Sequence, residues 1–437
     1  MLENLKKIGP GAIVASATIG AGETVLAVRA GAWGGYSLLW LVLLAAVTKS
    51  FLTLYMLGRY SAVSGQAVAE KLIDFPGPRG WLLWLILLLE AMVAPLVFVV
   101  IAVPCGRMMS QVLASLGVLL SYKWLAMAFV SLAIGVGMVQ QYETLEKSQL
   151  VVCLILLGGT VTATVLVGPD LKEIARGFFR FGYFPPYPDW VPAQISSRSP
   201  LLEMASVFGY AGSIPMNYVV YSNWVLIKGW TAEKAGHPGP ALRRALGPLR
   251  WDVAFNVVLV LVVTAAFMVA GAAILSPLHR IPRGFDLLTE QAQIFGQISR
   301  MMIPLYYVTI LTALWGTLNA LPDIYARGVH SFLRQLIPQA VNLEYRQVMT
   351  VFGVIMLVLT WLLIWTGTTP IIMIDLVALF STNLGVGLVC VAAVWLDRQL
   401  PPERRSSRLI WWATVLSAVV INLMAFLSAR EVLGKYL

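Results

Sequence analysis

The stretch that decides the fold is Gly11–Gly35, GAIVASATIGAGETVLAVRAGAWGG. It is apolar and long enough to cross a bilayer, which takes about 20 residues. Its middle, residues 19–24, reads IGAGET, and each glycine there weakens a helix by about 1 kcal/mol relative to alanine. Glu23 follows at this weak point, near the expected bilayer centre, where an unpaired charge costs several kcal/mol. A broken helix beside an acid at mid-membrane is typical of the ion or substrate site of a secondary transporter.

The composition of the whole chain predicts a polytopic α-helical membrane protein. Its 437 residues are 59% hydrophobic and only 12% charged, whereas soluble domains carry about 25% charged residues. The net charge of +10 sits in the loops between apolar runs, so we expect a lipid bilayer and not nucleic acid as the partner. The three cysteines are far apart and form no metal-binding pattern. Neither a disulfide framework nor a cofactor is therefore predicted.

Apolar runs predict about eleven spans, at roughly 11–32, 36–58, 81–104, 121–140, 148–168, 201–227, 251–275, 299–321, 347–366, 370–396 and 409–428. The loops on the side of Lys6 and Lys7 contain about eighteen basic residues, against about eleven on the other side. The positive-inside rule then predicts a cytoplasmic N-terminus and an external C-terminus. We expect a monomer in a bacterial inner membrane, with residues 169–200 forming an external loop or a short interfacial helix.

The sixth predicted span is interrupted as well. Residues 209–217 read GYAGSIPMN, which places glycines and Pro215 in mid-span. Proline removes a backbone hydrogen bond, and freed backbone groups in a membrane must line a cavity or be buried in protein. Two broken spans five apart predict an inverted repeat of five plus five helices within one domain. The repeats would be 11–168 and 201–396, with 409–428 as an additional helix.

Four segments together resemble the NRAMP family of divalent-metal transporters. They are GPGAIVASATIGAGETVLAVRAGAWGGYSLLW at 9–40, LYMLGRYSAVSG at 54–65, GSIPMNYVVYSNW at 212–224 and RWDVA at 250–254. The resemblance runs through most of the chain. It implies the LeuT-like fold, with helices one and six broken, and metal entry coupled to protons.

The sequence departs from this family in the site itself. The family's first-helix motif is Asp-Pro-Gly-Asn, whose Asp and Asn bind metal, but residues 20–23 read GAGE here. The family's sixth-helix methionine is Ile214, and its histidine is Met216. Family acids of the third helix that are tied to proton movement align with Val97 and Val100. We therefore predict a weaker preference for soft metals and weak or absent proton coupling.

Glu23 is the main candidate ligand, and its oxygens suit Mg²⁺, Ca²⁺, Mn²⁺ or Na⁺ better than softer ions. Neutral oxygens near the two breaks, and one acid in span ten, complete the candidate set. We expect Met216 to pack in the core, because two residues along a regular helix turn it about 200° from Ile214. The further candidates are Gly20, Ala21, Ser213, Ile214, Met216, Asn217 and Asp375.

Three other charged residues are expected at membrane depth, and a function in gating or ion pairing is one interpretation of each. Lys49 in span two is a counter-charge to Glu23 or Asp375, a tethered ammonium in an ion subsite, or a structural lysine. Arg29 is expected at a gate or an interface, and Glu90 in span three is either functional or a buried hydrogen-bonded acid.

Together these features predict an NRAMP-like secondary transporter that moves a divalent cation of the Mg²⁺ or Mn²⁺ class by alternating access. The cation would be the substrate and not a cofactor. The alternatives are an ion-coupled transporter of a small organic solute or amino acid, and a non-transporting membrane sensor on the same scaffold. We expect no enzyme, since no nucleophile–base pair or HExxH motif occurs, and no P-loop motif is present to power transport.

Overall fold

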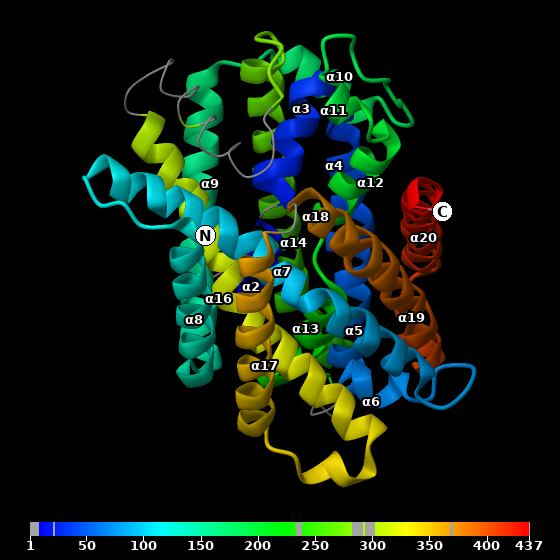
Figure 1. Cartoon of the computed structure of the whole chain (residues 1–437). Helices are drawn as coiled ribbons and strands as arrows, with labels where there is room; N and C mark the ends of the chain where they lie inside the picture. The colour runs from blue at the N-terminus through cyan, green and yellow to red at the C-terminus, as the bar shows by residue number, and fades with distance from the viewer. Residues whose placement is uncertain are drawn as a thin grey trace.

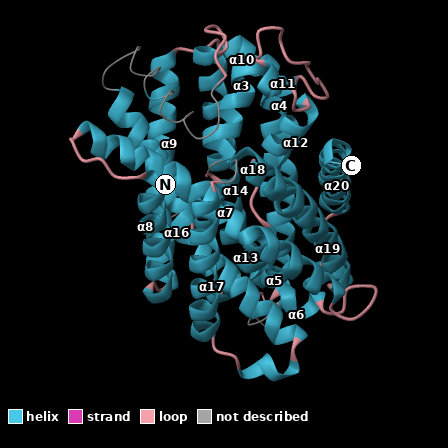
Figure 2. Ribbon diagram, viewed as in Figure 1, coloured by secondary structure: helices cyan, strands magenta, loops and turns pink. Residues whose placement is uncertain are grey.

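The structure is a computed structural model that describes residues 8–20, 22–232, 238–281, 292, 302–367 and 370–436. Within these ranges the regular elements are all helices (Figure 2). Ala21, one of the predicted site residues, lies outside the described residues, as do Lys6 and Lys7.

Helices occupy each of the eleven predicted spans. The first span comprises α2 (Pro10–Thr18), the π-helical η1 (Gly22–Ala27) and α3 (Val28–Gly34). The second comprises η2 (Gly35–Leu38), α4 (Leu39–Ala45), the π-helical η3 (Ala46–Thr53) and α5 (Leu54–Ser64). The next three are α7 (Trp81–Ser115), α8 (Tyr122–Val139) and α9 (Tyr142–Val167), and the sixth is α12 (Pro200–Tyr210) with α13 (Pro215–Ile227).

The remaining spans follow in the same order. They are α14 (Pro238–Ala270) with η4 (Gly271–Leu275), α16 (Met302–Leu336), α17 (Tyr345–Thr366), α18 (Pro370–Val377) with η7 (Ala378–Gly385) and α19 (Val386–Gln399), and α20 (Arg408–Tyr436). Short helices lie between spans: α6 (Val68–Leu72), α10 (Leu171–Phe179), α11 (Ala193–Ser196) and the 3-10 turns η6 (Pro338–Asn342) and η8 (Pro402–Arg404). In the described part of the chain, eight helical segments are long and apolar enough to cross a membrane.

The two broken spans lie inside the bundle, with α8 and α20 near opposite edges (Figure 1). The first span packs on α14, α9 and α16, and the sixth packs on α5, α20 and η7. We call the end of the molecule with α10 and α11 the α10 side, and the end with α6 the α6 side (Figure 1). This arrangement buries both breaks far from the bundle surface.

The outer faces of α8, α9, α17 and α20 expose large apolar side chains. Examples are Trp124, Val151, Leu362 and Leu416, all more than half exposed. Exposed apolar surface of this extent marks a membrane or protein interface, and here it lies on helices of membrane-spanning length. The polar candidate residues, by contrast, are buried between the helices.

Candidate functional site

The two predicted helix breaks pack against each other. In the first span, α2 ends at Thr18 and η1 begins at Gly22. In the sixth, α12 ends at Tyr210, and Pro215 begins α13 at a position where its missing N–H costs no helical hydrogen bond. Because η1 contacts α12 and α2 contacts α13, the four loose helix ends meet in one region.

A cavity of about 30 Å³ lies between these ends. Of the predicted site residues, Gly20, Ser213 and Ile214 line it. Hydroxyl groups and apolar side chains share the wall. From the broken helices themselves come Ala17, Thr18 and Tyr210, and from other helices come Thr317, Thr382, Val97, Val100, Ile101, Leu321 and Val377. Gly212 also lies at its edge. The cavity is therefore small and offers mainly neutral oxygens.

Glu23 lies just behind the cavity wall. Its Oε2 accepts a hydrogen bond of 2.9 Å from the backbone N–H of Gly20, which lines the cavity. The residue is only 1% exposed, and its Oε1 has no hydrogen-bond partner among the described residues. Buried polar atoms are nearly always partnered, so this oxygen marks a place where a cation or a proton would be stabilised.

The carbonyls freed by the first break already have hydroxyl partners. Thr317 on α16 places its Oγ1 2.9 Å from both the Ser16 and the Ile19 carbonyl oxygens. The Gly20 carbonyl accepts from the Thr24 hydroxyl at 2.9 Å. Sequence reasoning did not select Thr317, because a single threonine in an apolar span has no distinguishing pattern.

Three candidates in the sixth span have local partners. The Asn217 amide donates to Ser213 Oγ at 2.5 Å, while its Oδ1 is buried and unpartnered among the described residues. The sulfur of Met216 faces α16, where a Cβ added to Gly328 would lie 2.6 Å from it. Met216 is not among the residues that line the cavity, and its thioether packs against α16.

Lys49 requires a correction, because the structure pairs it with neither Glu23 nor Asp375. Its ammonium is completely buried and donates instead to the carbonyls of Phe208, Gly209 and Thr382 and to the Asn383 side chain. The end of α12 presents unpaired carbonyl oxygens, and these compete successfully with a more distant carboxylate.

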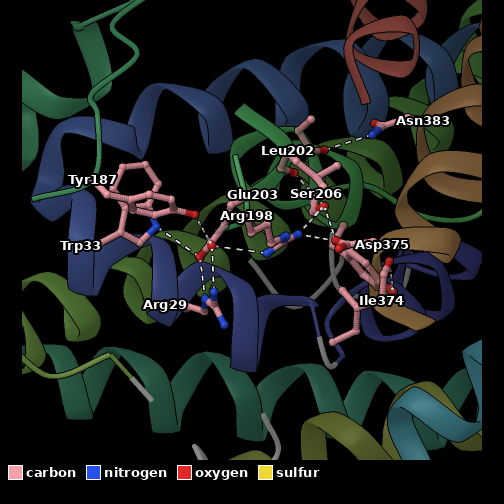
Figure 3. A network of polar contacts seen from close by, with 12 residues as sticks. Arg29, Trp33, Tyr187, Arg198, Leu202, Glu203, Ser206, Ile374, Asp375 and Asn383 are labelled. Atoms are coloured by element: carbon pink, nitrogen blue, oxygen red, sulfur yellow. Dashed lines mark hydrogen bonds and ion pairs between the residues drawn. The ribbon is translucent and has the colours of Figure 1, made fainter. Parts of the chain in front are cut away.

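Asp375 and Arg29 belong to one buried network on the α10 side (Figure 3). Glu203 on α12 is fully buried and accepts from Arg29 Nε at 2.8 Å and Nη2 at 3.1 Å. Arg198 bridges the two acids: it contacts Glu203 at 3.3 Å and Asp375 through a further ion pair. Asp375 does not line the cavity, and neither do Glu23 and Asn217, but among the described residues Asp375 alone of the three is ion-paired, to Arg198.

Aromatic side chains complete the network around Glu203. Trp33 donates to its carboxylate at 3.2 Å and Tyr187 at 2.8 Å. Tyr187 lies in the loop after α10, and its burial, with the nearby Glu203 charge, raises the pKa of its hydroxyl. Sequence reasoning missed Glu203 and Arg198 because both stand at the predicted end of a span, where charges are common.

Glu90 faces span ten. Its Oε1 accepts from the Ser381 hydroxyl at 2.6 Å, and the residue is 1% exposed. Ser381 directly precedes Thr382 and Asn383, which contact Lys49. The acid is thus a buried hydrogen-bonded group next to the lysine environment.

Three π-helical segments carry the charged and polar groups around the cavity. Glu23 lies in η1, Lys49 in η3, and Ser381 to Asn383 in η7. Such segments are rare and are often found at functional sites. Their sequences contain no motif that distinguishes them from ordinary α-helix.

Asp252 on α14 fixes the start of the first span on the α6 side. Its carboxylate accepts from the backbone N–H groups of Gly9 at 2.7 Å and Gly11 at 2.8 Å, and from the Tyr221 hydroxyl at 2.8 Å. A carboxylate at a helix N-terminus is favourable because it satisfies free N–H groups and the helix dipole. Asp252 thereby joins α2, α13 and α14.

Within the described ranges, no group of three or more His, Cys, Asp and Glu side chains is close enough to hold a metal ion. A cation bound at the breaks would therefore combine one carboxylate with neutral oxygens. Among divalent metals, hard ions accept such a ligand set most readily.

Comparisons with known proteins agree with this geometry. In structure, 98% of the chain aligns with 87% of a manganese transporter of Eremococcus coleocola, with a TM-score of 0.76 and 16% identity. It also aligns with MhsT bound to L-phenylalanine, over 96% of this chain and 98% of that one, with a TM-score of 0.60 and 13% identity. For a nucleobase-cation-symport-1 family transporter with bromovinylhydantoin bound, the coverages are 97% and 90%, the TM-score 0.55 and the identity 14%.

These structural likenesses show a shared fold, the LeuT-like fold that the family resemblance implies. No curated protein matches the sequence. Residues 11–430 do match the family described as natural resistance-associated macrophage protein-like. Since this match spans nearly the whole chain, the protein belongs to the natural resistance-associated macrophage protein-like (Nramp) family.

Proposed function

We propose that this protein is a secondary transporter that moves a divalent cation of the Mg²⁺ or Mn²⁺ class by alternating access. The observation that carries the proposal is the buried Glu23 carboxylate: one oxygen accepts a hydrogen bond from Gly20, which lines the cavity between the two helix breaks, and the other has no partner among the described residues. An acid at this depth is costly unless it serves a pathway or has a partner.

The ligand chemistry favours a hard cation. Glu23, Ser213, Asn217 and the freed carbonyls offer oxygen only, and Ile214 lines the cavity where the family places a thioether. Met216, the nearest sulfur in sequence, faces α16. Oxygen ligands suit Mg²⁺, Mn²⁺ and Ca²⁺, whereas sulfur selects softer ions.

The size of the cavity favours this proposal over the organic-solute alternative. At about 30 Å³ the cavity is small for a solute of amino-acid size. The fold itself does not distinguish a cation from an organic solute as the substrate. The chain aligns both with the manganese transporter and with MhsT, whose structure contains L-phenylalanine. The transported cation would be a substrate, and we expect no enzymatic activity.

We further propose that proton coupling is weak or absent. Val97 and Val100, which stand at the positions of family acids, both line the cavity as apolar side chains. Glu90 is bonded to Ser381 instead of facing a chain of acids. A proton path along the third span would therefore lack acids at positions 97 and 100 and would have only Glu90.

The proposed topology places the α10 side outside and the N-terminus in the cytoplasm of a bacterial cell, in a monomeric inner-membrane protein. Glu203 and its two arginines would close the external path, because together with Asp375 they join α3, α12 and α18 (Figure 3). Asp252 would act similarly on the α6 side by holding α2 to α14. Residues 11–168 and 201–396 would be the two repeats that move against each other.

Uptake into proteoliposomes tests this function. The purified protein should transport Mg²⁺ or Mn²⁺ saturably and should not transport phenylalanine. Glu143→Gln, a change at an exposed acid in the first turn of α9, is the matched control for carboxylate substitutions and should transport normally. Amino-acid uptake without cation uptake would favour the organic-solute alternative, and no uptake of any solute would favour the sensor.

A further inference from the structure

The environment of Lys49 is built like a cation site. Four oxygens lie within 3.2 Å of its Nζ atom: the carbonyls of Thr382 at 2.7 Å, Gly209 at 2.9 Å and Phe208 at 3.0 Å, and Asn383 Oδ1 at 3.2 Å. We call these four oxygens the Lys49 nest. They come from the end of α12 and from η7, two segments that are far apart in sequence.

The nest stabilises a positive charge without any carboxylate. An ammonium has three N–H donors, so four close oxygens exceed its hydrogen-bonding capacity and coordinate it as they would an ion. The carbonyls of Phe208 and Gly209 belong to the last turn of α12, where the helix dipole is negative. The Phe208 ring adds a cation–π contact, with its centroid 4.4 Å from Nζ.

The backbone around the nest leaves space only for this arrangement. A Cβ on Gly212 would lie 2.4 Å from Lys49 Cδ, so the break in the sixth span admits the lysine stem because it has glycine there. A Cβ on Gly209 would lie 2.7 Å from Thr382 Oγ1 and would separate α12 from η7. Both glycines of the break are thus required for the two halves of the nest to meet.

We propose that the Lys49 nest is a monovalent-cation site that the protein fills with its own ammonium. Main-chain carbonyls that replace a hydration shell are the usual ligands of alkali cations in proteins. An ammonium ion is close in size to K⁺ and larger than Na⁺. Once the Lys49 ammonium is removed, the nest therefore binds K⁺ better than Na⁺, while the wild-type protein binds neither there.

This inference deepens the proposed transport function and gives Lys49 a role in it. Lys49 lies in the second span, whereas its ligands lie in the sixth and tenth. A tethered charge that bridges these spans takes the place of a dissociable co-ion, so transport in the wild-type protein needs no alkali cation. The test below measures binding alone, so its outcome does not depend on whether the protein transports a divalent metal.

The experiment compares full-length wild-type protein with Lys49→Ala in detergent, by thermal unfolding in KCl, NaCl and choline chloride at equal ionic strength. The wild-type melting temperature should be the same in all three salts. Lys49→Ala should melt lower in choline and should recover saturably with K⁺, with a higher half-maximal concentration for Na⁺. The double variant Lys49→Ala/Asn383→Leu loses one of the four oxygens and should need more K⁺ for the same recovery.

Lys228→Ala is the matched control, because Lys228 pairs with a carboxylate, Glu146, at 2.8 Å and not with carbonyls. This variant should show no difference between K⁺ and choline. A Lys49→Ala protein that melts equally in all three salts would overturn the proposal, and so would selective K⁺ stabilisation of the wild type.

If Lys49→Ala does not fold in inorganic salts, propylammonium continues the test. This ion restores the three missing methylenes and the ammonium, so it should rescue folding of Lys49→Ala during purification. Rescue by propylammonium, but not by neutral propanol, supports a nest for positive charge. If propylammonium does not rescue folding of Lys49→Ala, or if propanol rescues it equally well, the proposed cation site is overturned.

Discussion

Replacing Glu203 by glutamine is expected to be among the most damaging single changes outside the cavity. The carboxylate is fully buried and accepts hydrogen bonds from Arg29, Trp33, Tyr187 and Arg198. Among the described ion pairs, Glu203 is the only partner of Arg29, whereas Arg198 also has Asp375. Glu203→Gln therefore leaves the Arg29 guanidinium, 3% exposed, without a counter-charge.

The size of the loss follows from that isolated charge. Removing one partner of a buried ion pair typically costs about 3–5 kcal/mol, because the other charge stays buried and uncompensated. Removing both charges avoids this penalty, so Arg29→Met/Glu203→Gln should be less destabilised than the sum of the two single variants. A coupling of about 0.5–3 kcal/mol is the usual range for residues in direct contact.

The assay is a double-mutant cycle on the free energy of unfolding, measured by reversible SDS titration in mixed micelles. Glu173→Gln is the control, because Glu173 forms an ion pair with Arg176 on the exposed surface of α10. Exposed pairs contribute about 0–1 kcal/mol, so the control should change little. A loss in Glu203→Gln no larger than that of the control, or strictly additive effects of the two variants, would refute the reasoning.

Three further outcomes are expected. Gly212→Ala should lose about 1–3 kcal/mol of unfolding free energy in the same titration, because the new Cβ overlaps the Lys49 stem. Gly158→Ala is the control and should be neutral or stabilised, because no other atom lies within 4 Å of the added Cβ. Thr317→Val should lower the free energy of unfolding by about 1–3 kcal/mol, because the Ser16 and Ile19 carbonyls lose their hydroxyl donor. An unchanged free energy of unfolding would show that Thr317 does not stabilise the first break. Calorimetry should find weak Cd²⁺ binding, and Met216→Ala should leave it unchanged because the Met216 sulfur faces α16. Tight Cd²⁺ binding by the wild type that is lost in Met216→Ala would contradict the hard-cation site.

The fold could be predicted because its signals are local in the sequence. Glycines at 20 and 22 and Pro215 interrupt apolar runs, and the chain breaks its helices at those places. The position and length of each apolar run likewise predicted where the membrane-spanning helices begin and end. The Asp252 contacts with Gly9 and Gly11 explain why that segment begins with the residues GPG, which the family resemblance identified without giving the reason.

The candidate site could be predicted only in part. Glu23 stood out as an acid in an apolar run, and its burial next to the cavity agrees with that expectation. The partners of Lys49 are mainly main-chain carbonyls, which every residue possesses, so no side-chain pattern identified them. Arg198, the partner of Asp375, lies 177 positions away in the sequence, so no local pattern indicated this ion pair.

The most direct measurement of the central claim is uptake of Mg²⁺ and Mn²⁺ by proteoliposomes containing either wild-type protein or Glu23→Gln. Glutamine keeps the shape of the side chain and one oxygen, but it removes the one carboxylate that, among the described residues, is hydrogen-bonded to the cavity wall. We predict saturable uptake by the wild type and none by Glu23→Gln, with Glu143→Gln behaving as wild type. Undiminished uptake by a folded Glu23→Gln protein would contradict the claim that the broken first helix carries the cation site.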